Sequence, residues 1–515
     1  MIGPRELPVR KERGGFAEIC DNASLRHRWL VPAAIIALLF TLQSLRRVGN
    51  GPWGVDGSYY MQVARHVAHG DGLLTSVCLY DQGLRTLPTR TNIYPLWPLT
   101  LGTFARVLPL AAAATFVPRV FFIADLLLLY ALVARFAPPL YANAAILLLG
   151  LNASFLSSTC YPYTEGLALF CSFGALLIFD IARSSNDPLY YAISGVVAAA
   201  AFLTRSQMLL LGVALMIVML AIRTSMRALT AFAAAYIVTA LPWMIYLTTF
   251  VRPFTFRALI AMHSETAGLP QYDQYVQVHG LGSYLVDRLH GVVVMFNPLS
   301  ELSFVESFGV AALLVPLAAI YAIWMRKWIG GATAAAVALS SALTCATLLD
   351  AHNRFFLEWL FGYRHGLPII LLIVVAMIQL NGRYARRIAI VLVAVSVVMA
   401  VPKVLAFATQ PPVEWPSAAE RQLATWLARN GPNAIVLTTN AQAMSVVSNA
   451  NFRWAACEQT PEEIARVLQL VRSDYVLVYE QEQRCAFVRG LGADATPFAA
   501  FGNAPNRVML LKVRR

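Results

Sequence analysis

Long apolar runs recur along this chain, and short basic segments separate them. A helix needs about 20 mostly apolar residues to cross a bilayer, and a shorter run can cross by including flanking residues. About eleven runs fit this description: Trp29–Leu45, Val120–Phe136, Tyr141–Leu156, Thr164–Ile181, Tyr190–Leu203, Met208–Ile222, Ala228–Leu247, Phe308–Met325, Ile329–Leu349, Leu367–Leu380 and Ile388–Val404. The pattern predicts an all-α polytopic membrane protein with about eleven transmembrane helices.

The basic residues between the runs indicate the topology. Residues 1–28 carry several arginines and no small-residue cleavage site, which is typical of an uncleaved signal anchor with a cytoplasmic N-terminus. Every second loop then contains basic residues, as cytoplasmic loops do: Arg135, Arg183, Arg223, Arg227, Arg326, Lys327, Arg383, Arg386 and Arg387. An odd number of spans places everything after Val404 outside, together with the long segments Arg46–Arg119, Arg252–Ser307 and Asp350–Gly366.

The composition excludes an ordinary soluble protein. Hydrophobic residues make up 58% of the 515 residues and charged residues 13%, about half of the usual share of roughly 25%. The net charge of +13 would suggest a nucleic-acid partner in a soluble protein. Here the sorting of cations by loop explains the charge, so we expect the bilayer as partner and no nucleic acid. The seven cysteines form no CxxC pair and no zinc spacing.

The last part of the chain, residues 410–515, has the pattern of a small soluble α/β unit. It follows the linker signal Gln410-Pro411-Pro412. The expected elements are a helix capped by Ser417 that runs to Asn430, strands at Ala434–Leu437, Tyr475–Tyr479 and Val508–Val513, and a helix that starts at Thr460. The sequence therefore predicts three parts: a cytoplasmic lead (1–28), a transmembrane domain (29–409) with a first outside loop (46–119), and an α/β domain outside the membrane (410–515).

Cys457 and Cys485 are the only cysteines of this last part. An oxidising compartment allows a disulfide between them, and a unit of this size gains stability from one. The alternative is two separate buried thiols, because free cysteine is among the most buried residue types. Geometry decides between the two, since a disulfide needs Cα atoms within about 7 Å.

The first outside loop carries the candidate chemistry. Asp56 follows the first span beside glycines, close to the membrane surface. The segment Ser58–His69 predicts an amphipathic helix in the interface plane, ended by Gly70-Asp71-Gly72. Its apolar stripe is Tyr60, Val63, Ala64 and Val67, and Gln62, Arg65, His66 and His69 are expected to face away.

These residues, with four later segments, resemble a known family. The loop reads D-x-x-Y-Y-x-x-x-A-R-x-x-x-x-G from Asp56 to Gly70. The later segments are Tyr94-Pro95-Leu96-Trp97-Pro98, Tyr161-Pro162-Tyr163-Thr164-Glu165, Leu203-Thr204-Arg205-Ser206 and Gly362-Tyr363-Arg364-His365-Gly366-Leu367-Pro368. In their order and shared outside location they resemble the GT-C glycosyltransferases, above all the bacterial branch with the lipid A aminoarabinose transferase and the protein O-mannosyltransferases. The resemblance covers roughly the first 400 residues.

The resemblance implies an inverting transfer of a sugar from a polyprenyl-phosphate donor to an outside-facing glycan, glycolipid or protein. In that reaction Asp56 is the catalytic base, assisted by Glu165, and Arg205 and Arg364 bind the donor phosphate. Tyr59, Tyr60, Arg65 and His365 are the residues expected to position the substrates. Many relatives have Asp-Glu where this chain has Asp56-Gly57, which weakens the case for a second carboxylate and for a metal site there. A divalent metal remains an option, and no residue is assigned to it.

Each of these residues also has a structural interpretation. Asp before Gly is a common turn, a carboxylate such as Glu165 suits a helix N-terminus, and Arg205 or Arg364 can snorkel to the interface. His66 and His69 lie three apart on a polar helix face, which is more often solvated than metal-bound. Asp125 lies inside a span, where we expect a structural pair with a neighbouring helix.

Two other classes of protein stay open at this point. A transporter or flippase for a polyprenyl-linked sugar would explain the spans, but it would explain poorly a long loop with a carboxylate on a surface helix. A scaffold subunit of an envelope assembly would use the last domain for binding. We expect a bacterial inner membrane, with the N-terminus in the cytoplasm and the C-terminus in the periplasm.

Overall fold

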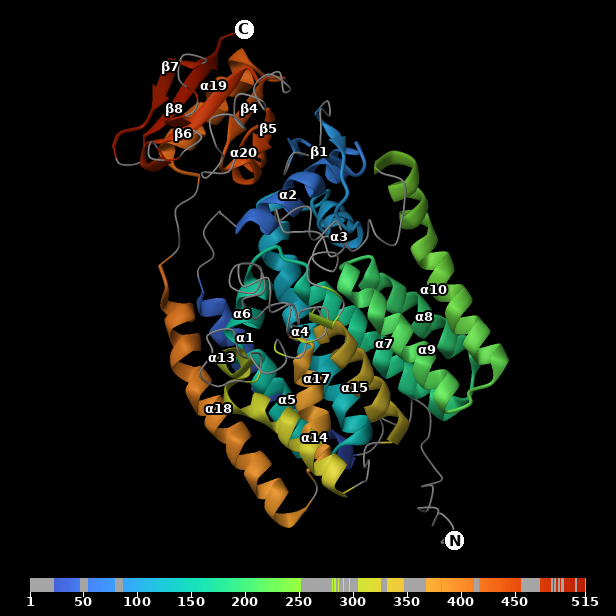
Figure 1. The fold of residues 1–515 in the computed structure, drawn as a ribbon. Helices are drawn as coiled ribbons and strands as arrows, with labels where there is room; N and C mark the ends of the chain where they lie inside the picture. Colours follow the sequence, from blue (N-terminus) through green and yellow to red (C-terminus); the bar gives the residue numbers. More distant parts are fainter. Residues whose placement is uncertain are drawn as a thin grey trace, which may run out of the picture.

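The computed structural model describes residues 23–46, 54–78, 87–251, 304–325, 331–346, 367–380, 382–411, 416–454, 473–482, 495–504 and 507–514, with isolated positions between 280 and 296 and between 485 and 491. Most of these residues form a helical bundle, and a small mixed sheet sits at one end of it (Figure 1). The bundle helices are α1 (Ala23–Leu45), α4 (Leu110–Phe136), α5 (Pro139–Gly150), α6 (Ala153–Cys160), α7 (Glu165–Ser185), α8 (Pro188–Phe202), α9 (Leu209–Ala221), α10 (Met226–Tyr246), α14 (Leu314–Met325), α15 (Gly331–Ala346), α17 (Ile369–Gln379) and α18 (Arg383–Thr409). Short turns extend several of them: η1 (Ser206–Met208), η2 (Leu247–Val251), α13 (Phe304–Phe308) and η4 (Gly309–Leu313).

The apolar runs of the sequence all coincide with helices of this bundle. Within the described residues, four helices are long and apolar enough to cross a membrane, or five if the bent pair of α5 and α6 forms one span. The four are Leu110–Phe136, Glu165–Ser185, Met226–Thr249 and Arg383–Thr409. Shorter apolar helices cover the other runs: Trp29–Leu45, Pro188–Phe202, Ser206–Ala221, Gly309–Met325, Gly331–Leu343 and Ile369–Gln379. The predominantly helical membrane fold is therefore confirmed, and the count of eleven crossings stays a prediction.

The 63° bend between α5 and α6 has a local cause. Asn152 caps α6 by accepting a hydrogen bond from the Phe155 backbone N–H at 3.0 Å. Its amide also donates to the carbonyl of Ser307 at 2.9 Å. An Asn side chain that satisfies backbone groups in this way starts a new helix instead of continuing the old one.

Small residues allow the bundle helices to approach closely. A Cβ at Gly195 of α8 would lie 2.4 Å from the carbonyl oxygen of Phe232 on α10, and a Cβ at Gly212 of α9 would lie 2.5 Å from the ring of Tyr236. Helices in lipid gain stability from such backbone contact, because the surrounding tails are as apolar as the side chains.

The mixed sheet is built from two distant parts of the chain. The last part contributes α19 (Ala418–Asn430), β4 (Ile435–Thr438), α20 (Ala441–Val447), β5 (Asn451–Trp454), β6 (Tyr475–Tyr479), η5 (Glu480–Glu482), β7 (Ala495–Phe501) and β8 (Val508–Val513). The first loop contains α2 (Gly54–His69), β1 (Leu74–Thr75), β2 (Val77–Cys78), β3 (Thr89–Arg90) and α3 (Leu96–Phe104). Of its strands, β1 and β3 form a separate antiparallel pair, and β2 joins the mixed sheet. The strand order is β2-β5-β4-β6-β8-β7, parallel from β2 to β6 and antiparallel from β6 to β7. Strand β2 thus adds the first loop to the edge of the C-terminal sheet.

A shared core joins the same two parts. Tyr59, Val63 and Val77 of the first loop are buried with Leu423 and Phe452 of the C-terminal unit. The predicted helix from Ser417 is confirmed, with a complete capping box between Ser417 and Glu420. The predicted strands correspond to β4, β6 and β8, while Thr460 lies outside the described residues.

The exposure expected for the polar face of α2 is wrong at Gln62 and Arg65. Gln62 is fully buried, donates to Thr75 Oγ1 at 2.6 Å and accepts from the Ser76 backbone N–H at 3.0 Å. Arg65 donates to the carbonyls of Val446 and Ser448 at the end of α20. The C-terminal unit covers this face (Figure 1), and the polar side chains tolerate burial because each has a hydrogen-bond partner.

Candidate active site

The central feature of the site is a buried ion pair between two helix ends. Glu165 lies in the first turn of α7, directly after Thr164. Arg205 lies in an extended break between α8 and η1. Arg205 Nη1 is 2.5 Å from Glu165 Oε1 and 3.0 Å from Thr164 Oγ1. The two charged side chains are only 13% and 3% exposed, so their attraction acts in a medium of low dielectric.

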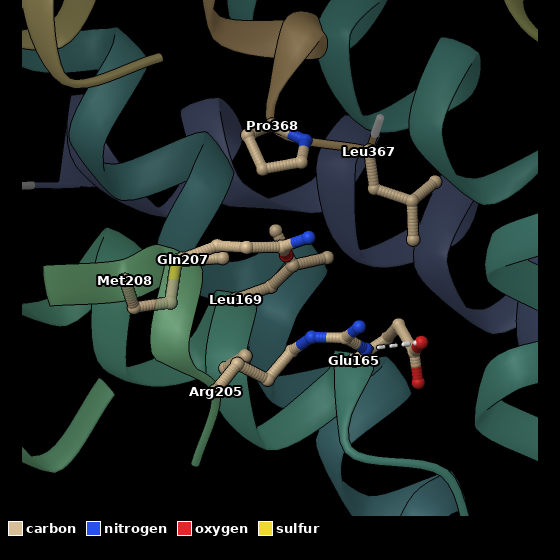
Figure 2. Close-up of a pocket in the computed structure, with 8 residues that line it drawn as sticks. Glu165, Leu169, Arg205, Gln207, Met208, Leu367 and Pro368 are labelled. Carbon is tan, nitrogen blue, oxygen red and sulfur yellow. Dashed lines mark hydrogen bonds and ion pairs between the residues drawn. The ribbon is translucent and has the colours of Figure 1, made fainter. Parts of the chain in front are cut away.

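This ion pair lines a narrow pocket. Figure 2 shows Leu367 and Pro368 facing the pair across the pocket. The remaining lining residues are Ala168, Leu169, Gln207 and Met208. The space inside is about 10 Å³, close to what one water molecule needs. A charged wall opposite an apolar wall is the arrangement of a site that holds a polar group attached to an apolar chain.

The first loop is fastened to both segments that carry the ion pair. The backbone N–H of Leu96, at the start of α3, donates to the carbonyl of Leu203 at 3.0 Å. The indole of Trp97, which is fully buried, donates to the carbonyl of Pro162 at 2.8 Å. The loop therefore sits at the same end of the bundle as Glu165 and Arg205. Three of the later motif segments, those that contain Trp97, Pro162 and Leu203, therefore contact one another.

Arg46 marks the same end of the bundle. It follows α1 and donates to the Tyr161 hydroxyl at 3.1 Å and to the carbonyl of Gln410 at 2.7 Å. Arg119 of α4 donates to the carbonyl of Arg46 at 3.4 Å. The Nε atoms of both arginines are buried without a hydrogen-bond partner, and no carboxylate of the described part of the chain forms an ion pair with either. Sequence reasoning assigned no function to these two cations, although an arginine at the outer end of a span is a visible signal.

The remaining predicted residues are placed as follows. Asp56 is half-buried in the first turn of α2. Tyr59 is buried, and its hydroxyl lies 3.3 Å from Thr91 Oγ1. Tyr60 is half-buried. Arg364 and His365 lie outside the described residues. The structure thus brings Glu165 and Arg205 together, and the approach of Asp56 to them stays a prediction.

The two histidines of α2 are also accounted for. His66 Nδ1 lies 3.0 Å from Asp71 Oδ2 and Nε2 lies 2.8 Å from Ser76 Oγ. Burial lowers the pKa of His66, against the opposing effect of Asp71. His69 is exposed. Among the described residues, no group of three or more His, Cys, Asp or Glu side chains could hold a metal ion.

Asp125 lacks the structural pair expected for it. It is fully buried in α4, and neither carboxylate oxygen has a hydrogen-bond partner among the described residues. A Cβ at Gly166 would lie 3.7 Å from its Oδ2. Asp125 thus lies against α7 at Gly166, the residue after Glu165, and forms no ion pair with a cation of the described part of the chain.

Cys485 is disulfide-bonded. Cys457, its predicted partner, lies outside the described residues, so the pairing of these two cysteines stays a prediction.

Comparison with known proteins identifies the fold. The chain matches no protein-family model, and no curated protein sequence matches it. It is similar to the oligosaccharyltransferase of Archaeoglobus fulgidus, with a TM-score of 0.57 and 12% identity over 88% of this chain and 70% of that one. The same enzyme, named AglB, was solved with an inhibitory peptide and a dolichol-phosphate, and there the TM-score is 0.57 at 14% identity over 90% and 71%.

Two further solved structures are similar. The arabinofuranosyltransferase AftD from Mycobacteria gives a TM-score of 0.50 and 13% identity over 95% of this chain and 40% of that one. ArnT from Cupriavidus metallidurans, bound to undecaprenyl phosphate, covers 94% and 98% at 12% identity, with a TM-score of 0.42 that adds no weight. All of these are GT-C glycosyltransferases. The chain therefore has the GT-C fold, as the order of its motifs predicted.

Proposed function

We propose that this protein is an integral-membrane, inverting glycosyltransferase that transfers a sugar from a polyprenyl-phosphate donor to a glycan, glycolipid or protein. The observation that carries the proposal is the buried Glu165–Arg205 pair in the wall of a mostly apolar pocket. The GT-C fold supports the proposal, and so does the dolichol-phosphate bound by the similar enzyme AglB.

In this proposal Arg205 binds the phosphate of the donor. Glu165 and Thr164 hold its Nη1 edge, which orients the planar guanidinium before the lipid arrives. An oriented donor in a low-dielectric site stabilises the charge that develops on a leaving phosphate more than water does. The pocket must widen to admit a phosphate, and Leu367 and Pro368 form the wall that moves. Arg364, close before them in the sequence, is a second candidate ligand.

The chemical step is a single displacement. The acceptor hydroxyl attacks the anomeric carbon, the bond from that carbon to the phosphate oxygen breaks, and the phosphate leaves with the electron pair. Asp56 takes the proton of the hydroxyl as general base. The cations Arg46 and Arg119 add positive potential at the same end of the bundle, which attracts an anionic donor. The enzyme acts on the outer side of a bacterial inner membrane, with residues 1–28 in the cytoplasm and 410–515 in the periplasm.

Replacement of Asp56 tests the proposal. Asp56→Asn in purified protein should abolish sugar transfer from a polyprenyl-phosphate donor and leave donor binding intact. Asp71→Asn is the matched control, because Asp71 is an exposed carboxylate of the same loop. Unchanged turnover in Asp56→Asn would show that Asp56 is not the general base. Transport of the donor without sugar transfer would show that the protein is not a glycosyltransferase.

A further inference from the structure

A hollow on the C-terminal unit has the composition of a saccharide site. It has a volume of about 420 Å³, within the range of small-molecule pockets. One wall is the outer face of α19, and Phe501 of β7 closes the other side. The lining residues are Arg421, Gln422, Thr425, Trp426, Arg429, Asn430 and Phe501. Two aromatic rings thus stand among amide, hydroxyl and guanidinium groups, which are the donors that sugar hydroxyls and acidic substituents use.

A β-bulge places a third ring, that of Phe498, beside this hollow, in contact with Trp426. The register of β7 against β8 shifts between Pro497 and Ala499, so Phe498 is the extra residue. In a regular strand Phe498 and Phe501 would point to opposite faces. With the bulge both contact Trp426, with ring centroids 5.7 and 6.4 Å from it. Bulges re-aim side chains at edges and binding sites, and Phe498 remains 49% exposed.

The charge of the hollow is positive. Its lining contains two arginines and no acidic residue. Lys512 adds a cation over the face of Phe498, 5.8 Å from the ring centroid. Arg421 is held by the carbonyl of Pro416, whereas Arg429 is exposed at the end of α19. Guanidinium groups beside aromatic faces favour a ligand that carries carboxylate or phosphate groups.

The position of the hollow fits a long ligand. Strand β7 forms one edge of the six-stranded sheet, and β2 of the first loop forms the other. Five strand spacings of about 4.8 Å separate the edges by about 24 Å. A single sugar in the hollow could not also reach the first loop, but a polymer could lie across both.

From these observations we propose that the hollow over Trp426, Phe498 and Arg429 binds an acidic polysaccharide. The chain would stack its sugar rings on the aromatic side chains and pair its acidic groups with the arginines. The binding of this glycan in the hollow is independent of the proposed function. Its role as the acceptor rests on the proposed function. The site would hold a polymeric acceptor while its growing end lies at the first loop.

Binding to the full-length protein in nanodiscs tests the site. The probes are an oligogalacturonate, which is anionic, and a neutral malto-oligosaccharide of the same length. We expect saturable binding of the anionic probe, at least tenfold weaker binding of the neutral one, and a fall in affinity with salt. Trp426→Ala and Phe498→Ala should each weaken binding of the anionic probe at least tenfold. Phe498→Ala is the better variant of the two, because the side chain is half-exposed and its removal leaves no cavity in the core.

Charge variants sharpen the test. Arg429→Gln should weaken binding at low salt and reduce the salt dependence. Arg489→Gln removes an equally exposed cation next to the core cluster on the other face of the sheet and should bind like the wild type. Asp56→Asn should also bind normally, so failure of the proposed reaction and failure of this site are distinguishable. The proposal would be overturned if the wild type showed no saturable binding of the anionic probe. It would also be overturned if Phe498→Ala and Arg429→Gln bound that probe as tightly as the wild type.

Discussion

The two ends of α7 each carry a buried carboxylate paired with arginine, and the pairs differ in what surrounds them. At its N-terminal end, which the predicted topology places on the outer side, Glu165 meets Arg205 at 2.5 Å beside a pocket. At the other end, Asp180 meets Arg135 of α4 at 2.5 Å and Arg183 of its own helix at 3.3 Å. Thr333 of α15 donates to the same Asp180 at 2.5 Å. Asp180 therefore connects three helices.

The backbone explains the different roles of the two pairs. Arg135 and Arg183 lie in the last turns of their helices, where a cation also stabilises the helix dipole. Arg205 lies in an extended break, where no helix gains from its charge. A cation held outside regular structure, next to a pocket, is available to a ligand. We therefore expect the Asp180 pair to stabilise the bundle and the Glu165 pair to serve the proposed reaction.

The largest expected effect is loss of stability at the inner end. Asp180→Ala leaves two arginines without their carboxylate, and such a break in a buried pair costs about 3–5 kcal/mol. The thermal midpoint of the purified protein should fall, while turnover per folded molecule stays unchanged. A stable variant with reduced turnover would reverse the roles that we assign to the two ends.

Neutralising the outer pair should give the opposite result. The double variant Glu165→Gln with Arg205→Gln leaves no isolated charge, so stability should change little. Turnover should fall about 10²–10³-fold, as for loss of one preorganised donor to a developing charge. The matched control is Asp180→Asn with Arg135→Gln, which should keep turnover. Equal turnover in both double variants would remove the functional difference between the ends.

The two threonines extend the comparison with a smaller effect. Thr333→Val removes a hydrogen bond to a charged carboxylate and should cost about 1.5–3 kcal/mol of stability. Thr164→Val removes one acceptor from Arg205 and should instead raise the KM for the donor several-fold. The two changes are isosteric, so a difference between them in unfolding free energy and in KM reports the different roles of the two ends. A raised KM in Thr333→Val would contradict these roles.

The smallest effect concerns pH, and it arises at the His66–Asp71 contact of the first loop. Burial holds the pKa of His66 below its usual 6.5, so below that pH the unfolded loop binds more protons than the folded one and stability falls. With Asp71 47% exposed, the loss should stay under about 1 kcal/mol. Hydrogen exchange of α2 between pH 7.5 and 5.5 measures it, and His66→Gln should abolish the pH dependence.

Local patterns were sufficient to predict much of this molecule. Apolar runs determine where helices form in lipid, because every backbone group must be paired within its own helix. The capping box at Ser417 and Glu420 is equally local. The motif order was enough to predict the GT-C fold, and two motif residues, Glu165 and Arg205, do meet.

Other features depended on contacts that no local pattern encodes. Strand β2 has two residues and pairs with β5 far along the chain, so it carries no periodic signal. Gln62 was expected to face away from the apolar side of its helix and is buried, because Thr75 and Ser76 of the same loop fold back to bond it. The position of Asp56 relative to the ion pair depends on how that unit and the bundle hold α2.

By itself, the sequence determined which segments are helical, where a helix is capped, and which residue types reach the outer end of the bundle. These follow from hydropathy and hydrogen bonding over a few residues. Only the tertiary structure decided which arginine meets which carboxylate, and that the first loop completes the C-terminal sheet. It also decided that Phe498 turns toward Trp426. These outcomes depend on the packing of residues far apart in the chain, where the burial of one segment is set by the surface of another.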